Sequence, residues 1–123
     1  MTLYHVRLEL AREKDHPTGS ERHGYEFTAP LDELGHLDAA QWRQARRQCL
    51  MRRFWVGEDD RQGELIHTKG GRWAFSYDPA TDTDDEAIFR LDRHTIRAGE
   101  YLSITEPEGE QHTFRVVRVA LVQ

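Results

Sequence analysis

Apolar and polar residues alternate along several short runs of this chain, and that period of two restricts it to folds built mainly from β-strands. Within residues 3–10, charged or polar side chains separate four apolar ones on the opposite face, Tyr4, Val6, Leu8 and Leu10. Successive side chains of a strand point to opposite faces of a sheet, so this run predicts a strand with one buried face. A polar loop follows, and residues 25–30 predict a second, shorter strand that ends at Pro30.

Two adjacent glycines, Gly70 and Gly71, predict a β-hairpin between residues 65–69 and 72–77. A two-residue turn of type I′ needs positive φ at both central positions, which glycine adopts without strain. Counting outward from this turn gives three pairs on one face, Thr68 with Trp73, Ile66 with Phe75 and Glu64 with Tyr77. Because this face is rich in aromatic residues, we expect it to pack inward.

The remaining alternating runs predict further strands. One starts at Arg52 and is followed by an acidic connection at residues 57–63, and a short strand is expected at 88–91. Residues 101–105 and 111–122 form a second expected hairpin, with a proline and a glycine in its turn that suit a type I turn and a glycine bulge. The last run is apolar on both faces, which indicates a central or barrel-closing strand.

One helix is expected, over residues 39–49. Asp38 can cap its N-terminus by accepting a hydrogen bond from a first-turn N–H, and Gln41 stands where it can reciprocate in a capping box. Leu37 and Trp42 have the spacing of a hydrophobic staple. The apolar stripe of this helix consists of Trp42, Ala45 and Cys49.

Together these elements predict a single α+β domain over residues 1–123. The expected architecture is a strongly bent antiparallel sheet, or a partly open small β-barrel, of six or seven strands with one inserted α-helix. Leu, Ile, Val and Phe make up 26 of the 123 residues, enough for a modest core at a net charge of only −5. The sequence has no run long and apolar enough for a membrane span and no signal-peptide pattern, and its one cysteine excludes an internal disulfide, so a cytoplasmic location is expected.

Four segments resemble those of a family of small uncharacterised bacterial proteins of similar length. They are residues 52–60 (RRFWVGEDD), 73–79 (WAFSYDP), 99–101 (GEY) and 112–117 (HTFRVV). The resemblance implies a free-standing bacterial domain. It implies no activity and transfers no site residues.

The sequence predicts no catalytic residue, metal site or cofactor. Cys49 lies on the apolar stripe of the helix, where a cysteine packs as a small hydrophobe. None of the seven histidines has the spacing of a helical metal site. Acidic residues at 82, 84 and 86 superficially resemble a calcium loop, but Ala87 and Arg93 replace the glycine and glutamate that such a loop requires. A site with two histidines and a carboxylate, or a weak cation site in the acidic loop, remains open.

Arginine and tryptophan side chains concentrate around the end of the helix and the strands that follow it. Five bases fall between Arg43 and Arg53 with no acid among them. Arginine and tryptophan are enriched at interaction hot spots, although the tryptophans can equally belong to the core. The predicted binding residues are Arg46, Arg47, Arg52, Arg53, Trp55, His67, Lys69 and Arg72.

The leading functional hypothesis is a non-enzymatic binding or accessory domain that recognises an acidic protein, a peptide or an anionic ligand through this arginine and tryptophan surface. The net charge of −5 argues against a nucleic-acid partner. The alternative is a small enzyme whose histidine and carboxylate pocket assembles only in three dimensions. A deep pocket holding two or more of His5, His67, His94 and His112 would favour the enzyme, and a flat arginine and tryptophan patch would favour binding.

Overall fold

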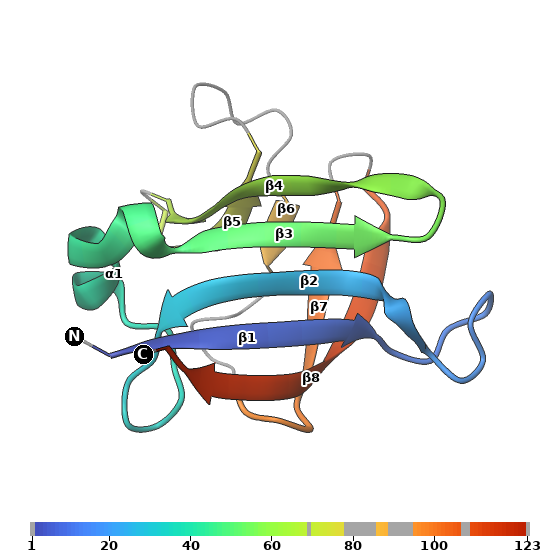
Figure 1. Ribbon diagram of the computed structural model, residues 1–123, viewed down its shortest axis with the longest axis horizontal. Coiled ribbons are helices and arrows are strands. Elements are labelled where there is room, and N and C mark those ends of the chain that lie inside the picture. Colours follow the sequence, from blue (N-terminus) through green and yellow to red (C-terminus); the bar gives the residue numbers. More distant parts are fainter. Residues whose placement is uncertain (1, 69, 78–85, 89–94, 107–108, 123) are drawn as a thin grey trace.

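Eight antiparallel strands form a closed barrel in the computed structural model, which describes residues 2–68, 70–77, 86–88, 95–106 and 109–122. Each strand pairs with the next along the chain, and the last returns to the first (Figure 1). The strands are β1 (Leu3–Leu10), β2 (Ser20–Pro30), β3 (Leu50–Trp55), β4 (Glu58–His67), β5 (Trp73–Ser76), β6 (Glu86–Ile88), β7 (Tyr101–Thr105) and β8 (Gln111–Leu121). The helix α1 (Ala39–Ala45) and the short 3-10 helix η1 (Arg46–Gln48) lie between β2 and β3.

The predicted α+β fold, a strongly bent antiparallel sheet with one inserted helix, is confirmed. The structure has eight strands rather than six or seven, and pairing of β1 with β8 along Tyr4–Leu10 closes the sheet. The predicted acidic connection at 57–63 belongs mostly to β4, which begins at Glu58. Its first residues are exposed, so they lack the apolar alternation that identifies a strand in sequence.

Aromatic side chains fill the interior of the barrel. Tyr25 lies 5.1 Å from both Phe75 and Phe114 between ring centroids, and Phe27 lies 5.2 Å from Phe75. All four rings are fully buried. Burial of such rings is the main favourable contribution to the stability of a core this small.

The helix closes one end of the barrel. Trp42 is buried and donates its indole N–H to the Leu65 carbonyl oxygen at 2.8 Å. The predicted cap is confirmed, because the Asp38 carboxylate accepts from the Gln41 backbone N–H at 3.0 Å. The reciprocal bond of a capping box is absent, since the Asp38 N–H donates to the Pro30 carbonyl oxygen at 3.1 Å.

The helix is shorter than predicted: α1 ends at Ala45, and residues 46–48 form a 3-10 turn instead of continuing to 49. The tighter turn redirects the chain into β3 and leaves the Cys49 side chain fully buried. The predicted packing role of Cys49 is confirmed. Burial also raises the pKa of its thiol to about 11, which keeps it protonated near neutral pH.

The predicted register of the β4–β5 hairpin is wrong by one residue. Leu65 pairs with Phe75 and His67 with Trp73. Residues 68–72 lie between the two strands. The Thr68 backbone N–H donates to the Arg72 carbonyl oxygen and the Gly71 N–H to that of Thr68, which leaves a turn of three residues. Only Gly71 of the two glycines has positive φ, at 78°, so the turn is not the two-residue turn that needs two such positions. Trp73 and Phe75 still face inward, as predicted.

Candidate functional site

A polar cavity of about 280 Å³ lies at the end of the barrel opposite α1. The β1–β2 connection and the β3–β4 turn project from this end, at the right of Figure 1. We call the cavity the barrel mouth. Its lining residues are Glu13, Asp15, His16, Arg53, Trp55, Glu58, Arg61, Glu106, Glu110 and His112. They come from three hairpins that are far apart in sequence.

A buried ion pair forms the inner wall of the barrel mouth. Arg53 Nη2 donates to Glu106 Oε1 at 2.8 Å, and each side chain is only 7% exposed. Arg53 Nη1 also donates to Glu58 Oε1 at 3.0 Å, and the guanidinium lies 4.3 Å from the centroid of the Trp55 ring. Burial lowers the pKa of Arg53, but hydrogen bonds and charges from Glu106 and Tyr25 outweigh it and raise that pKa overall. Arg53 therefore stays protonated.

A second polar cluster joins the β1–β2 connection to β8. Glu13 Oε2 lies 3.0 Å from His112 Nδ1, and its Oε1 lies 3.3 Å from His16 Nδ1. Burial raises the pKa of Glu13, but the hydrogen bonds from His112 and His16 outweigh it, so the pKa is lowered. Glu110 Oε1 lies 3.7 Å from Nε2 of His112, so a carboxylate stands near each nitrogen of this imidazole.

The floor beneath these clusters is aromatic. His23 is 8% exposed, and its ring meets Trp55 edge-on at 4.5 Å and His16 at 4.6 Å. Burial, followed by the charges of His16 and Arg53, lowers the pKa of His23. Its Nδ1 lies 2.6 Å from Ser20 Oγ. The ring is thus neutral at pH 7 and acts as a rigid neighbour for Trp55.

The barrel mouth carries a net negative charge, because five carboxylates and two guanidinium groups line it. Glu58 and Glu110 are 53% and 65% exposed, and Asp15 is also exposed. Among the residues that the structure describes, no group of three or more His, Cys, Asp or Glu is placed to hold a metal ion. The arrangement is suited to electrostatic and hydrogen-bond recognition.

The predicted binding residues separate into three places. Arg53 and Trp55 line the barrel mouth. Arg52, one residue along β3, faces the outside and pairs with Glu26 at 2.8 Å and Asp60 at 2.6 Å. Neighbouring residues of a strand point to opposite faces, so no strand can present both arginines together.

The other predicted binding residues lie at the helix end of the barrel. Arg46 and Arg47 are in η1, His67 contacts Trp73 at 4.5 Å between ring centroids, and Arg72 is exposed in the β4–β5 connection. Lys69 lies outside the described residues, as do His94 and the acidic positions 82 and 84. Trp73 belongs to the core at 3% exposed, whereas Trp55 is half-buried.

Sequence reasoning missed Glu13, Glu106 and most other carboxylates of the barrel mouth. They occur in polar connections, and nothing in their local sequence distinguishes them from solvated loop residues. His94 lies outside the described residues, and of the other three histidines named for an enzyme pocket only His112 lines the mouth. His5 lies on the outer face, 3.0 Å from Glu26, and His67 lies at the other end of the barrel.

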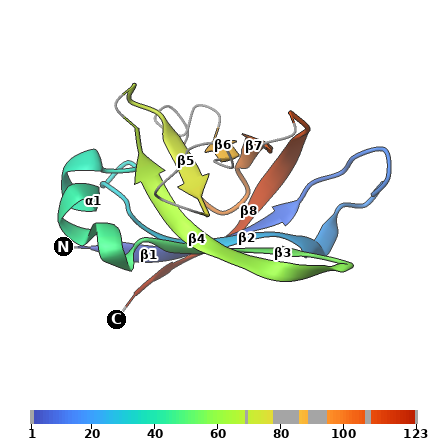
Figure 2. The ribbon, with the colours of Figure 1, turned by 90° about the horizontal axis from the view of Figure 1, so that it is seen from above.

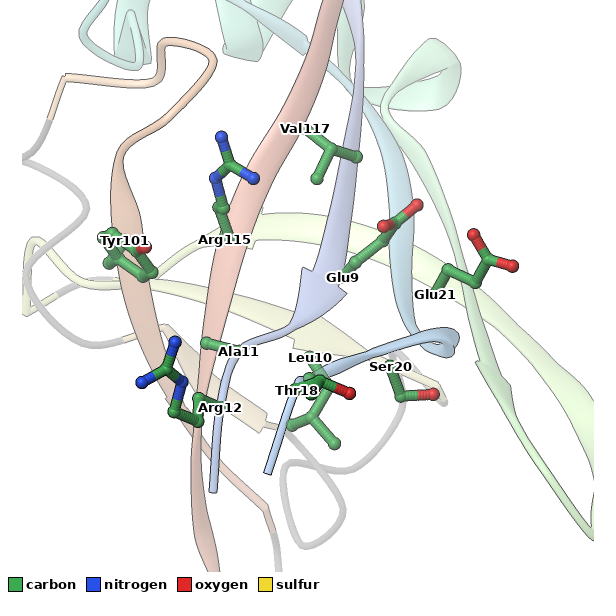
Figure 3. Close-up of a pocket in the computed structure, with 11 residues that line it drawn as sticks. Glu9, Leu10, Ala11, Arg12, Thr18, Ser20, Glu21, Tyr101, Arg115 and Val117 are labelled. Carbon is green, nitrogen blue, oxygen red and sulfur yellow. The ribbon is translucent and has the colours of Figure 1, made fainter. Parts of the chain in front are cut away.

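A shallower groove of about 510 Å³ lies on the outside of β1 and β8. Figure 3 shows Arg12, Arg115 and Tyr101 along one side of it and Glu9 and Glu21 along the other. The two charge types balance, and Glu9 is already paired with Arg7 at 2.8 Å. The groove therefore presents no dominant charge to a ligand.

No family model, curated protein or solved structure matches this chain. No helix in the described part of the chain is both long and apolar enough to cross a membrane.

Proposed function

We propose that this protein is a binding domain that takes a small organic cation, such as a primary amine, in the barrel mouth. The observation that carries the proposal is the excess of carboxylates around a cavity whose inner wall is the buried Arg53–Glu106 pair. Burying an ion pair contributes little stability compared with apolar packing. Buried charges in a cavity are more typical of a binding site.

The charge of the barrel mouth selects the class of ligand. Arg53 is neutralised by Glu58 and Glu106, so it does not offer a free positive charge to an anion. Asp15 and Glu110 are exposed at the rim, and Glu58 is 53% exposed although it pairs with Arg53. A cation entering the cavity gains their attraction, while an anion is repelled. The sequence predicted that Arg53 and Trp55 bind an anionic ligand. The ligand proposed for the same two residues is a cation.

Three probes of similar shape and different charge test this: n-butylammonium, n-butanol and butyrate. We expect n-butylammonium alone to shift the indole N–H resonance of Trp55 and the amide resonance of His112 in a heteronuclear NMR titration. Asp15→Asn combined with Glu110→Gln should weaken that binding about fivefold to tenfold, which corresponds to about 1 kcal/mol. Glu33→Gln, at an exposed acid outside the cavity, is the control and should have no effect. Equal shifts with all three probes, or a preference for butyrate, would refute the proposal.

The rival proposal is a small enzyme in which His112 acts as a general base. Glu13 holds Nδ1 of His112 at 3.0 Å, as an orienting carboxylate does in acid–base catalysis. Nε2 lies 3.7 Å from Glu110 Oε1 at the rim. A probe that is chemically altered by the wild type but not by His112→Asn would favour the enzyme. A probe recovered unchanged favours the binding domain.

A further inference from the structure

We propose that a surface at the helix end of the barrel docks an acidic, partly apolar segment of a partner protein. This helix-end surface consists of Arg43, Arg46, Arg47 and Leu50. It is independent of the barrel mouth, from which it is separated by the length of β3. Figure 2 shows α1 at the end of the molecule away from the β3–β4 turn.

The three arginines surround a hollow of about 620 Å³ between the helices and β4. All three side chains are exposed, and two glutamines, Gln44 and Gln48, complete most of the rim. Glu64 is the one acid among the lining residues. The hollow is therefore locally positive on a chain whose net charge is −5.

In the part of the chain that the structure describes, no ion pair balances the charges of this surface. Within the described residues, no ion pair involves Arg43, Arg46 or Arg47, whereas Arg7, Arg52 and Arg53 each bind two acids. Like charges three or four residues apart on a helix repel each other. A bound acidic segment would relieve this repulsion, which makes association more favourable.

One of the arginines lies over a buried tryptophan of the helix. The Arg46 guanidinium lies 5.4 Å from the centroid of the Trp42 ring, and Trp42 is held in place by its hydrogen bond to the Leu65 carbonyl oxygen. A guanidinium that stacks on a buried indole loses less conformational entropy when it binds a carboxylate.

Leu50 indicates that the partner is a protein. Its side chain is 56% exposed at the start of β3, three residues beyond Arg47. Leu50 is the register partner of Glu64, which lines the hollow. An exposed leucine at the edge of this positive hollow matches an apolar residue flanked by acids, whereas a nucleic-acid backbone offers it no counterpart. The net charge of −5 also opposes nucleic acid.

The test uses a fluorescein-labelled synthetic peptide with the sequence Glu-Glu-Leu-Glu-Glu-Leu-Glu-Glu and measures its Kd by fluorescence anisotropy. Arg43→Glu combined with Arg47→Glu should raise Kd at least about tenfold, because reversed charges repel the peptide. Leu50→Ser should raise it about threefold. Binding to the wild type should weaken as salt rises from about 50 to about 300 mM, since exposed charges are screened.

Arg97→Glu combined with Arg118→Glu is the matched control, because both are exposed arginines that do not line the hollow, one before β7 and one on β8. It changes the net charge equally and should leave Kd within about twofold of the wild type. The first double variant keeps Arg46 on Trp42, so its thermal midpoint should match that of the control. Equal loss of binding in both double variants would overturn the proposal. Tighter binding of a single-stranded oligonucleotide at this surface would overturn it as well.

Discussion

At the scale of single residues, Arg53 holds a buried charge in the wall of the barrel mouth. Its side chain enters the barrel from β3, where it contacts Glu106, Glu58 and the face of Trp55. A charge this deeply buried is tolerated only while its partners remain in place. The ion pair is therefore a structural requirement of the barrel mouth as well as its inner wall.

Replacing one member of this pair should be more harmful than replacing both. Glu106→Leu removes the buried carboxylate that pairs with Arg53, and we expect it to lower the free energy of unfolding by about 3–5 kcal/mol. Adding Arg53→Met should recover most of that loss, because the double variant buries two apolar side chains in place of one unpaired charge. Urea denaturation of the two variants measures both effects. A cost below about 1 kcal/mol for Glu106→Leu would mean that Glu58 alone compensates Arg53.

At the scale of elements, local signals and tertiary contacts jointly determine each boundary. Asp38 sets the start of α1, because its side chain caps the first turn of the helix, as the sequence indicates. The far end of the helix is set by tertiary structure, because Cys49 must reach the core before β3 begins. The β4–β5 hairpin behaves in the same way: its position follows from the two glycines, but its register does not.

The two glycines of that hairpin should respond differently to alanine. Gly71 has φ of 78°, and a Cβ there would meet nothing within 4 Å, so the cost of Gly71→Ala is purely conformational. We expect it to be about 1 kcal/mol. Gly70→Ala is the matched control, since Gly70 is not in the positive-φ region and its Cβ would only approach Thr68 Oγ1 at 3.9 Å. Thermal denaturation compares them, and equal midpoints would contradict the three-residue turn.

At the scale of the whole molecule, pairing of β1 with β8 removes the open edges of the sheet. Exposed edges invite aggregation, and closure abolishes them. On the outer face, Glu26 of β2 links three strands: it pairs with Arg7 and His5 of β1 and with Arg52 of β3. This network ties β1, β2 and β3 together on the outer face of the barrel.

The Glu26 network makes the stability of the barrel depend on pH. Burial raises the pKa of Glu26, but the His5 hydrogen bond, Arg52 and Arg7 outweigh it, so the pKa lies below its ordinary value of 4.5. A lowered folded pKa stabilises the barrel above that value, and the contribution disappears as pH falls through the folded pKa.

Glu26→Gln should therefore destabilise the barrel at pH 7, by about 1–2 kcal/mol. The difference from the wild type should shrink steadily below about pH 4.5. Urea denaturation across this range measures it. A difference that stays constant down to about pH 2 would assign the loss to packing instead of charge.

The periodic and local features of this protein follow from its sequence alone. Alternation in residues 3–10 and 111–122 predicts the two strands that close the barrel, and Asp38 predicts where the helix starts. These features depend on side-chain period and on backbone groups a few residues apart, both of which are readable without knowing the fold. The aromatic inward face at Trp73 and Phe75 belongs to the same category.

Only the tertiary structure determined which residues line the barrel mouth and where each arginine of the cluster lies. Glu13, Arg53, Glu106 and His112 come from separate hairpins, and they meet only because the sheet curls through its full circle. Arg52 and Arg53 are neighbours in sequence but point to opposite faces of β3, so one becomes an outer ion pair and the other the wall of a cavity. A run of charges specifies composition, whereas the alternation of a strand and the closure of the sheet determine which of those charges share a site.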